Sequence, residues 1–159
     1  MLATPEALNQ CWSIDFMHDA LTCGKCFRTF NVVDDLNRET LAIEIALNTP
    51  VQRVVRVLDR IVVTHGYPLK MRMYNVPELI SQALAQWAEK HSVVLEFIKP
   101  GKPIQNAFIE RFNRTYWTEI LDFYLFRTLN EAREIAERWL TEYNSERPHE
   151  SLKNLTPEE

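Results

Sequence analysis

Two acidic residues lie in apolar surroundings. Asp15 is inside the segment WSIDFMH, and Glu110 is inside the segment AFIERF. A buried carboxylate is costly unless a cation or a hydrogen-bond donor compensates it. Carboxylate oxygens are also the ligands that hard cations such as Mg²⁺ prefer. The two acids are therefore a candidate magnesium site. The alternative is that Asp15 faces solvent, on the polar side of an alternating strand.

The elements that must position these acids follow from the periodicity of the chain. Alternating apolar and polar residues, joined by short turn-rich links, predict antiparallel strands. These strands are expected at 12–18, 27–33 and 41–46. Helices and strands alternate in the rest of the chain. The expected order is helix 51–66, strand 68–73, helix 77–91 opened by Pro77, strand 93–98, helix 104–121 and helix 129–143. The predicted fold is α/β, a mixed five-stranded sheet flanked by helices.

The composition bounds the class of protein. The chain has 159 residues with 46% hydrophobic and 25% charged residues, and its formal charge is −4. These values indicate one globular domain, which we divide into an N-terminal extension 1–10, a core 11–146 and a C-terminal tail 147–159 packed on the core. Without a long apolar run, no membrane span is expected. The acidic balance argues against coating nucleic acid by bulk charge and leaves room for a local basic patch.

Cys23 and Cys26 form a CxxC motif in TCGKC. Zinc requires four ligands, and only Cys11 and His18 lie nearby in the sequence to complete them. The Gly-Lys pair between the cysteines is typical of a turn between two strands. We interpret the motif as a hairpin that carries two thiols in a reduced, cytoplasmic protein, and zinc binding stays the alternative.

Five segments, taken in order, resemble one known family. They are WSIDFMHD, FRTFNVVDDLNRETLAIEI, the PE of YNVPELIS, KPGKPIQNAFIERFN and YNSERPHESL. Together they are similar to the integrase catalytic core of bacterial insertion-sequence transposases, relatives of the retroviral integrases. The resemblance covers residues 11–157 and implies a ribonuclease H-like fold.

The resemblance implies a DDE recombinase. In this family three acids bind two Mg²⁺ or Mn²⁺ ions and drive DNA transesterification without a covalent enzyme intermediate, and paired metals of this kind clamp the attacking and leaving oxygens. By its motif, Asp15 matches the first acid and Glu110 the third. The implied partners are double-stranded DNA, at element ends and target, and further copies of the chain. No membrane and no small-molecule substrate are implied.

The second acid is where this sequence departs from the family. The family has the aspartate of a DNGPEF-like motif with 35 residues between it and the glutamate, and here that position is Tyr74. Val76 and Leu79 replace the glycine and the phenylalanine. A neutral phenol is a poor magnesium ligand, so we expect little strand transfer. Two alternatives are that Glu78 supplies the carboxylate or that Tyr74 is itself a nucleophile. Decay of an element copy is the preferred explanation.

Basic residues gather beside Glu110. Between positions 99 and 114 the chain has a net charge of +3, which would supply sequence-independent phosphate contacts. The alternative is a solvated helix face. The expected DNA-binding residues are Lys99, Lys102, Gln105, Asn106, Arg111, Asn113 and Arg114. Arg147 and His149 belong to the tail, and no chemistry is assigned to them.

Three functions are compatible with these features. The first is a transposase catalytic core that cuts element ends and joins them to a target, impaired by Tyr74. The second is a catalytically inactive remnant that binds DNA and self-associates. The third is a ribonuclease H-like nuclease that acts on hybrids.

Overall fold

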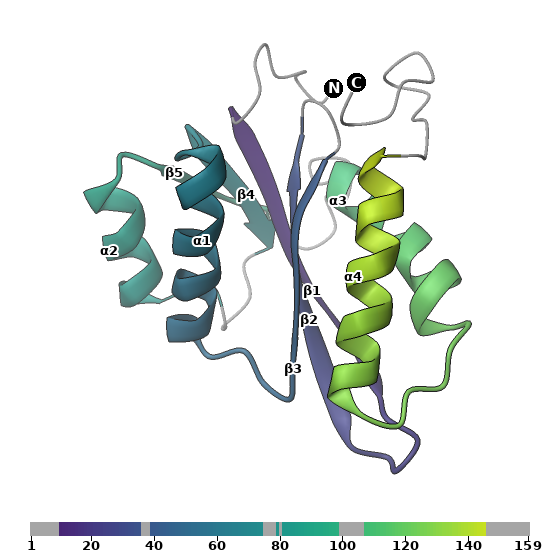
Figure 1. Ribbon diagram of the computed structural model, residues 1–159. Helices are drawn as coiled ribbons and strands as arrows, with labels where there is room; N and C mark the ends of the chain where they lie inside the picture. Colours follow the sequence, from purple (N-terminus) through teal and green to yellow (C-terminus); the bar gives the residue numbers. More distant parts are fainter. Residues whose placement is uncertain (1–9, 36–38, 75–78, 80, 99–106, 146–159) are drawn as a thin grey trace.

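A five-stranded mixed sheet forms the centre of the molecule (Figure 1). The computed structural model describes residues 10–35, 39–74, 79, 81–98 and 107–145. The strands are β1 (Cys11–Ala20), β2 (Cys26–Asp34), β3 (Thr40–Ala46), β4 (Lys70–Tyr74) and β5 (Val94–Ile98). Their order in the sheet is β3-β2-β1-β4-β5. The first three strands pair antiparallel, and β4 and β5 add to them in parallel, which confirms the predicted sheet.

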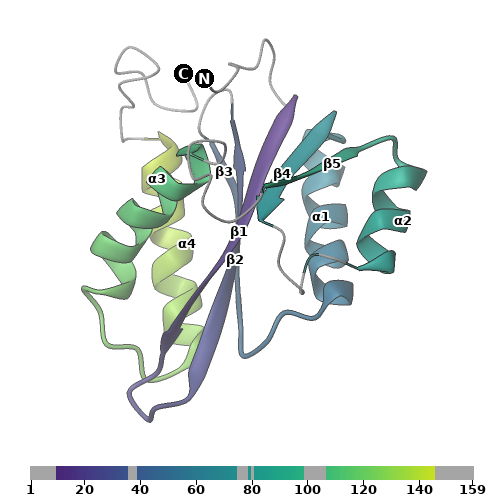
Figure 2. The ribbon, with the colours of Figure 1, turned by 180° about the vertical axis from the view of Figure 1, so that it is seen from behind.

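Helices cover both faces of this sheet. Figures 1 and 2 show α1 and α2 on one side and α3 and α4 on the other. The helices are α1 (Val51–His65), α2 (Gln82–Lys90), α3 (Ala107–Tyr116) and α4 (Leu129–Ser145), and the π-helical turn η2 (Trp117–Leu121) continues α3. None of the helices in the described parts of the chain has the length and apolarity that a bilayer crossing requires.

Each face of the sheet has its own apolar core. Trp12 and Ile14 point from β1 into a cluster with Leu58 of α1 and Leu84 of α2. Because side chains alternate along a strand, the residues between them on β1 point to the other face. There the core is formed mainly by α3, η2 and α4, and Phe112 is at its centre, in ring contact with three other aromatic side chains. Asp15 is thus directed towards the α3 side.

Several predicted boundaries differ from the structure, and most of the differences are one or two residues. Strand β4 begins at Lys70, two residues after Pro68, and continues to Tyr74. Helix α2 does not open at Pro77 but at Gln82, since the Ser81 hydroxyl accepts a hydrogen bond from Leu84 N at 3.1 Å and caps the helix there.

The helix predicted over 104–121 also differs. Its described α-helical part is α3, and the chain then widens into η2, where the Asp122 amide donates to Trp117 O at 2.7 Å. The predicted start at 104 lies outside the described residues. So do the tail 147–159 and, apart from Gln10, the extension 1–10.

The TCGKC segment is the turn of the β1–β2 hairpin, as predicted. Leu21 N donates to Lys25 O at 2.9 Å, and Gly24 adopts a φ of 90° that favours glycine. Cys23 and Cys26 are free and exposed. Across the described ranges, no three His, Cys, Asp or Glu side chains come together as a metal-binding group.

Candidate active site

Asp15 is half-buried beneath α3, so the alternative of a solvent-facing aspartate is wrong. Its Oδ1 accepts a hydrogen bond from Phe16 N at 2.8 Å, and its Oδ2 accepts one from Asn113 Nδ2 at 2.9 Å. Burial raises the pKa of Asp15 to about 6, the two donors lower it, and the nearby charge of Glu110 raises it. Asp15 therefore has the environment of a carboxylate that a cation would stabilise.

Tyr74 is the last residue of β4, the strand that pairs in parallel with β1. The last paired residues are Ser13 and Arg72, so Asp15 and Tyr74 each lie two residues beyond the pairing and on the face of their strand that Ser13 and Arg72 occupy. The Tyr74 hydroxyl donates a hydrogen bond to Glu110 Oε1. The residue at the second-acid position thus contacts the third acid directly.

Glu110 is in the first turn of α3, where the helix dipole favours a negative charge. Burial raises the pKa of Glu110, and the positive charge of Arg114, one turn further along the helix, lowers it. Strands β1 and β4 and helix α3 therefore bring Asp15, Tyr74 and Glu110 to one site, although they are far apart in the sequence. The catalytic roles of these residues stay a prediction.

The donor set suits a hard cation only in part. Asp15 and Glu110 offer two carboxylates whose mutual repulsion a Mg²⁺ ion would relieve. Tyr74 offers a phenol whose proton is directed at Glu110 rather than a third carboxylate. These residues fit one divalent ion better than the pair that a complete DDE site holds.

Two amide side chains complete the site, and one was not predicted. Asn113, expected to contact DNA, has its side chain directed at the sheet, where it also accepts a hydrogen bond from Asn31 Nδ2 at 3.0 Å. Asn31 is fully buried on β2, directly opposite Asp15 in the antiparallel pair. A polar residue within the apolar run FNVV was a signal in the sequence that pointed to Asn31.

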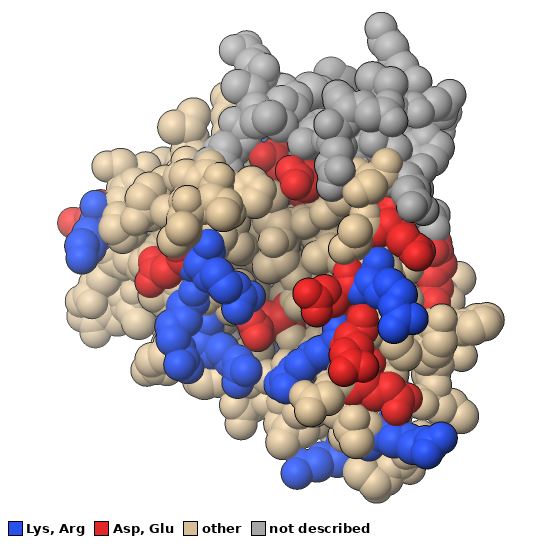
Figure 3. All heavy atoms as spheres, in the orientation of Figure 1, with Lys and Arg blue, Asp and Glu red and all other residues tan. Residues whose placement is uncertain are grey.

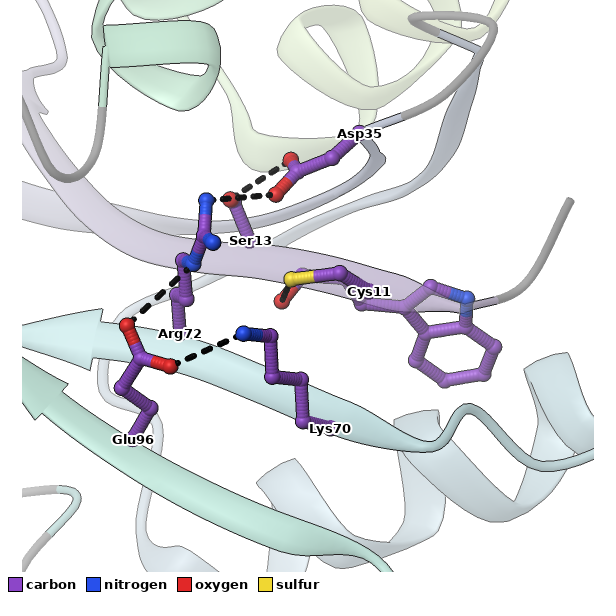
Figure 4. Close-up of polar contacts among 7 residues, drawn as sticks. Cys11, Ser13, Asp35, Lys70, Arg72 and Glu96 are labelled. Atoms are coloured by element: carbon purple, nitrogen blue, oxygen red, sulfur yellow. Dashed lines mark hydrogen bonds and ion pairs between the residues drawn. The ribbon is translucent and has the colours of Figure 1, made fainter. Parts of the chain in front are cut away.

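A charged network lies next to the site (Figure 4). Ser13 on β1 and Arg72 on β4 belong to it, each two residues before Asp15 or Tyr74, and Glu96 joins it from β5. Ser13 donates to Asp35 Oδ1 at 2.6 Å, and Arg72 approaches Asp35 Oδ2 at 3.7 Å and Glu96 Oε1 at 3.3 Å. Lys70 pairs with the other oxygen of Glu96 at 3.1 Å. Asp35 and Arg72 are almost fully buried, so this network fixes β4 against β1 just ahead of Tyr74 and Asp15.

The predicted basic strip is described only at its helical end. Arg111 and Arg114 are exposed on α3, while Lys99, Lys102, Gln105 and Asn106 lie outside the described residues. The face over α1 and α4 is different, because side chains of both signs alternate there (Figure 3). Glu44, for example, pairs with Arg60 at 3.1 Å. Among the described residues, the basic side chains of α1 on that face thus have acidic side chains beside them.

A mixed sheet of this order, with helices on both faces and acids meeting at the β1–β4–α3 junction, defines the ribonuclease H-like integrase core fold. Two family models, both described as Integrase core domain, match residues 5–103 and residues 91–157. The chain belongs to the integrase core domain family.

Two insertion-element proteins are similar along nearly the whole chain. The insertion element IS407 uncharacterized 31.7 kDa protein of Burkholderia multivorans is 42% identical over 158 residues, which cover 99% of this chain and 57% of that protein. The insertion element IS476 uncharacterized 39.2 kDa protein of Xanthomonas euvesicatoria is 38% identical, covering 94% of this chain and 43% of that protein. The chain thus spans about half the length of these relatives.

Solved structures share the fold at low identity. A chain of the simian T-cell lymphotropic virus intasome, in complex with PP2A regulatory subunit B56 gamma, matches with a TM-score of 0.77 and 15% identity, covering 99% of this chain and 55% of that chain. The trimeric form of the HTLV-2 integrase catalytic core domain in complex with magnesium matches with a TM-score of 0.69 and 15% identity, covering 99% and 97%.

Proposed function

We propose that this chain is the catalytic core of an insertion-element transposase that acts on DNA with divalent metal, and that Tyr74 impairs its chemistry. The observation that carries the proposal is the meeting of Asp15, Tyr74 and Glu110 at one site, with the Tyr74 hydroxyl bonded to Glu110. Two of the three expected acids are present, and the second-acid position holds a hydrogen-bond donor, Tyr74.

The proposed chemistry assigns a part to each group. A bound Mg²⁺ or Mn²⁺ ion would supply Lewis-acid stabilisation of the phosphoryl oxygens during cleavage and strand transfer. Asp15 and Glu110 would hold that ion, and Tyr74 would leave a second ion without a carboxylate. Double-stranded DNA would lie along the exposed basic side chains of α3, Arg111 and Arg114. The trimeric form of the viral core supports self-association. The larger masses of the two insertion-element relatives support further segments in the complete proteins of this kind.

Two further proposals concern the organisation of the chain and its setting. We propose that residues 11–146 form the core, with the extension 1–10 and the tail 147–159 at its ends. The absence of a disulfide among the three cysteines, all of which are free, supports a reducing, cytoplasmic setting.

The experiment is an assay of Mg²⁺- and Mn²⁺-dependent nicking and strand transfer on element-end DNA. The unmodified chain is compared with the variants Tyr74→Asp and Glu110→Gln. We expect activity only in Tyr74→Asp. Activity in the unmodified chain that Glu110→Gln abolishes would show that Tyr74 does not impair the site. Cleavage of RNA–DNA hybrids without joining would instead favour a nuclease, and DNA binding without activity in any variant would favour the inactive remnant.

A further inference from the structure

We propose that Asn113 and Asn31 form a positioning pair, which holds the Asp15 carboxylate and the helix that carries Glu110 in the geometry that binds metal. This inference rests on the proposed function. Asn113 Nδ2 donates to Asp15 Oδ2 at 2.9 Å, and Asn31 Nδ2 donates to Asn113 Oδ1 at 3.0 Å. The two bonds join β1, α3 and β2.

The chain of hydrogen bonds has one direction. An ionised carboxylate only accepts, so Asn113 must present its NH₂ group to Asp15 and its carbonyl oxygen to Asn31. Asn31 must then present its own NH₂ group to Asn113. Asn31 thereby decides which end of the Asn113 amide faces the acid. If Asn31 were apolar, the Asn113 amide would be free to turn its oxygen towards Asp15, where it would repel the carboxylate.

The position of Asn113 explains why the effect reaches both acids. It lies three residues after Glu110, and residues at this spacing share one face of a helix. Its bond to Asp15 therefore holds the part of α3 that carries Glu110 against β1. The Phe16 amide holds Asp15 Oδ1 at 2.8 Å, so both carboxylate oxygens receive a directed donor.

The burial of the polar Asn31 side chain lowers stability in a way that packing alone does not explain. Asn31 is fully buried, and its Oδ1 has no hydrogen-bond partner within the described part of the molecule. Leucine would fill a similar space without an unpaired acceptor. A residue that breaks the rule of satisfied buried polar groups is expected where function requires it. Orientation of the Asn113 amide is such a requirement.

The test measures Mn²⁺ affinity by calorimetry in the full chain carrying Tyr74→Asp. Adding Asn113→Leu or Asn31→Leu is expected to weaken Mn²⁺ binding roughly tenfold, as the loss of a partner that orients a metal ligand does. Because the two amides act in series, the combined variant should bind no more weakly than the weaker single variant. Asn31→Leu should keep its melting temperature while it loses affinity, which a merely structural residue would not do.

Asn144 provides a matched control. It is a buried asparagine whose side chain bonds the backbone of Thr40, with Nδ2 to Thr40 O at 3.0 Å and Thr40 N to Oδ1 at 2.9 Å. Asn144→Leu should lower the melting temperature and leave Mn²⁺ affinity unchanged. Affinities within twofold of the parent in both Asn113→Leu and Asn31→Leu would overturn the positioning role.

Absence of Mn²⁺ binding in the Tyr74→Asp chain would count against the proposed metal site. A second measurement, made without metal, tests the positioning pair in that case. Urea unfolding of Asp15→Ala, Asn113→Leu and the double variant, in chelator, reports the coupling of the two side chains without metal. Coupled effects are expected from the hydrogen bond between them. Additive effects would overturn the positioning role.

Discussion

The Tyr74 hydroxyl on β4 donates a hydrogen bond to Glu110 Oε1 on α3, so the residue at the predicted second-acid position is bonded to the residue predicted as the third acid. A carboxylate at position 74 would reverse this relationship, because it would repel Glu110 instead of donating to it. Only a cation between the two groups would then make the arrangement stable.

The first prediction concerns the response to metal. Tyr74→Asp should lower the melting temperature in chelator, because it adds a third acid to the site. It should regain stability with Mn²⁺, since a ligand that binds the folded state at 100 times its Kd contributes about 2.7 kcal/mol. For a chain of this size that is a rise of roughly 5–10 °C in a thermal scan.

Tyr74→Phe is the control for this prediction. It removes the hydroxyl that donates to Glu110 but supplies no carboxylate. Its Mn²⁺ response should equal that of the unmodified chain, which is expected to be smaller than that of Tyr74→Asp because two carboxylates rather than three would hold the ion. Equal shifts in the Asp, Phe and unmodified chains would contradict the role assigned to position 74.

The second prediction concerns pH. The pKa of Asp15 is raised from 3.8 to about 6 on folding, so the folded state keeps this proton over a range in which the unfolded state has lost it. The proton stabilises the fold fully below pH 3.8, and this stabilisation is lost as the pH rises through about 6. The shift corresponds to about 3 kcal/mol at most.

Asp15→Asn, which does not titrate, isolates this effect. Urea unfolding in chelator should show the unmodified chain losing stability relative to Asp15→Asn between pH 4 and pH 7. Only the change with pH is compared, because asparagine also loses one hydrogen bond, to either Phe16 N or Asn113. Parallel stability curves would show that Asp15 has an ordinary pKa in the folded chain.

The third prediction concerns the network around Arg72. Arg72→Met should destabilise the chain by about 3–5 kcal/mol, because it removes a buried cation that pairs with the buried carboxylate of Asp35. Lys70→Met is the matched control, since Lys70 shares the partner Glu96 with Arg72 but is about one-third exposed. An exposed pair contributes less than about 1 kcal/mol, so this variant should unfold at nearly the original urea concentration. Similar losses in both variants would contradict the assigned importance of burial.

The fourth prediction concerns DNA. Arg111→Ala and Arg114→Ala should each weaken binding to a duplex of arbitrary sequence and reduce the slope of log K against log salt by about 1. Arg127→Ala is the control, because Arg127 is also exposed but lies beside the β1–β2 hairpin turn, where Phe126 O accepts from Thr22 N. Fluorescence anisotropy across a salt series measures the slopes. A loss for Arg127→Ala as large as for the α3 variants would place the DNA elsewhere.

Much of the fold was determined by the sequence itself. The alternation in WSIDFMH assigned Trp12 and Ile14 to one face of β1 and Asp15 to the other, and the structure confirms this because strand periodicity is a local property. The boundary of α2 was less predictable. Both Pro77 and Ser81 are typical of helix starts, and the choice depends on which residue caps the free amides in the folded chain.

The site itself was decided by tertiary structure. Spacing and motif singled out Asp15, Tyr74 and Glu110, but the bond between Tyr74 and Glu110 joins positions 36 apart and depends on how α3 lies on the sheet. The orientation of Asn113 likewise depends on Asp15 and Asn31, which are 98 and 82 positions away. Sequence periodicity specifies the face that a side chain occupies, because the backbone repeats regularly. The partner that it meets on that face is specified only when separate elements pack together, because packing brings distant residues within the reach of a hydrogen bond.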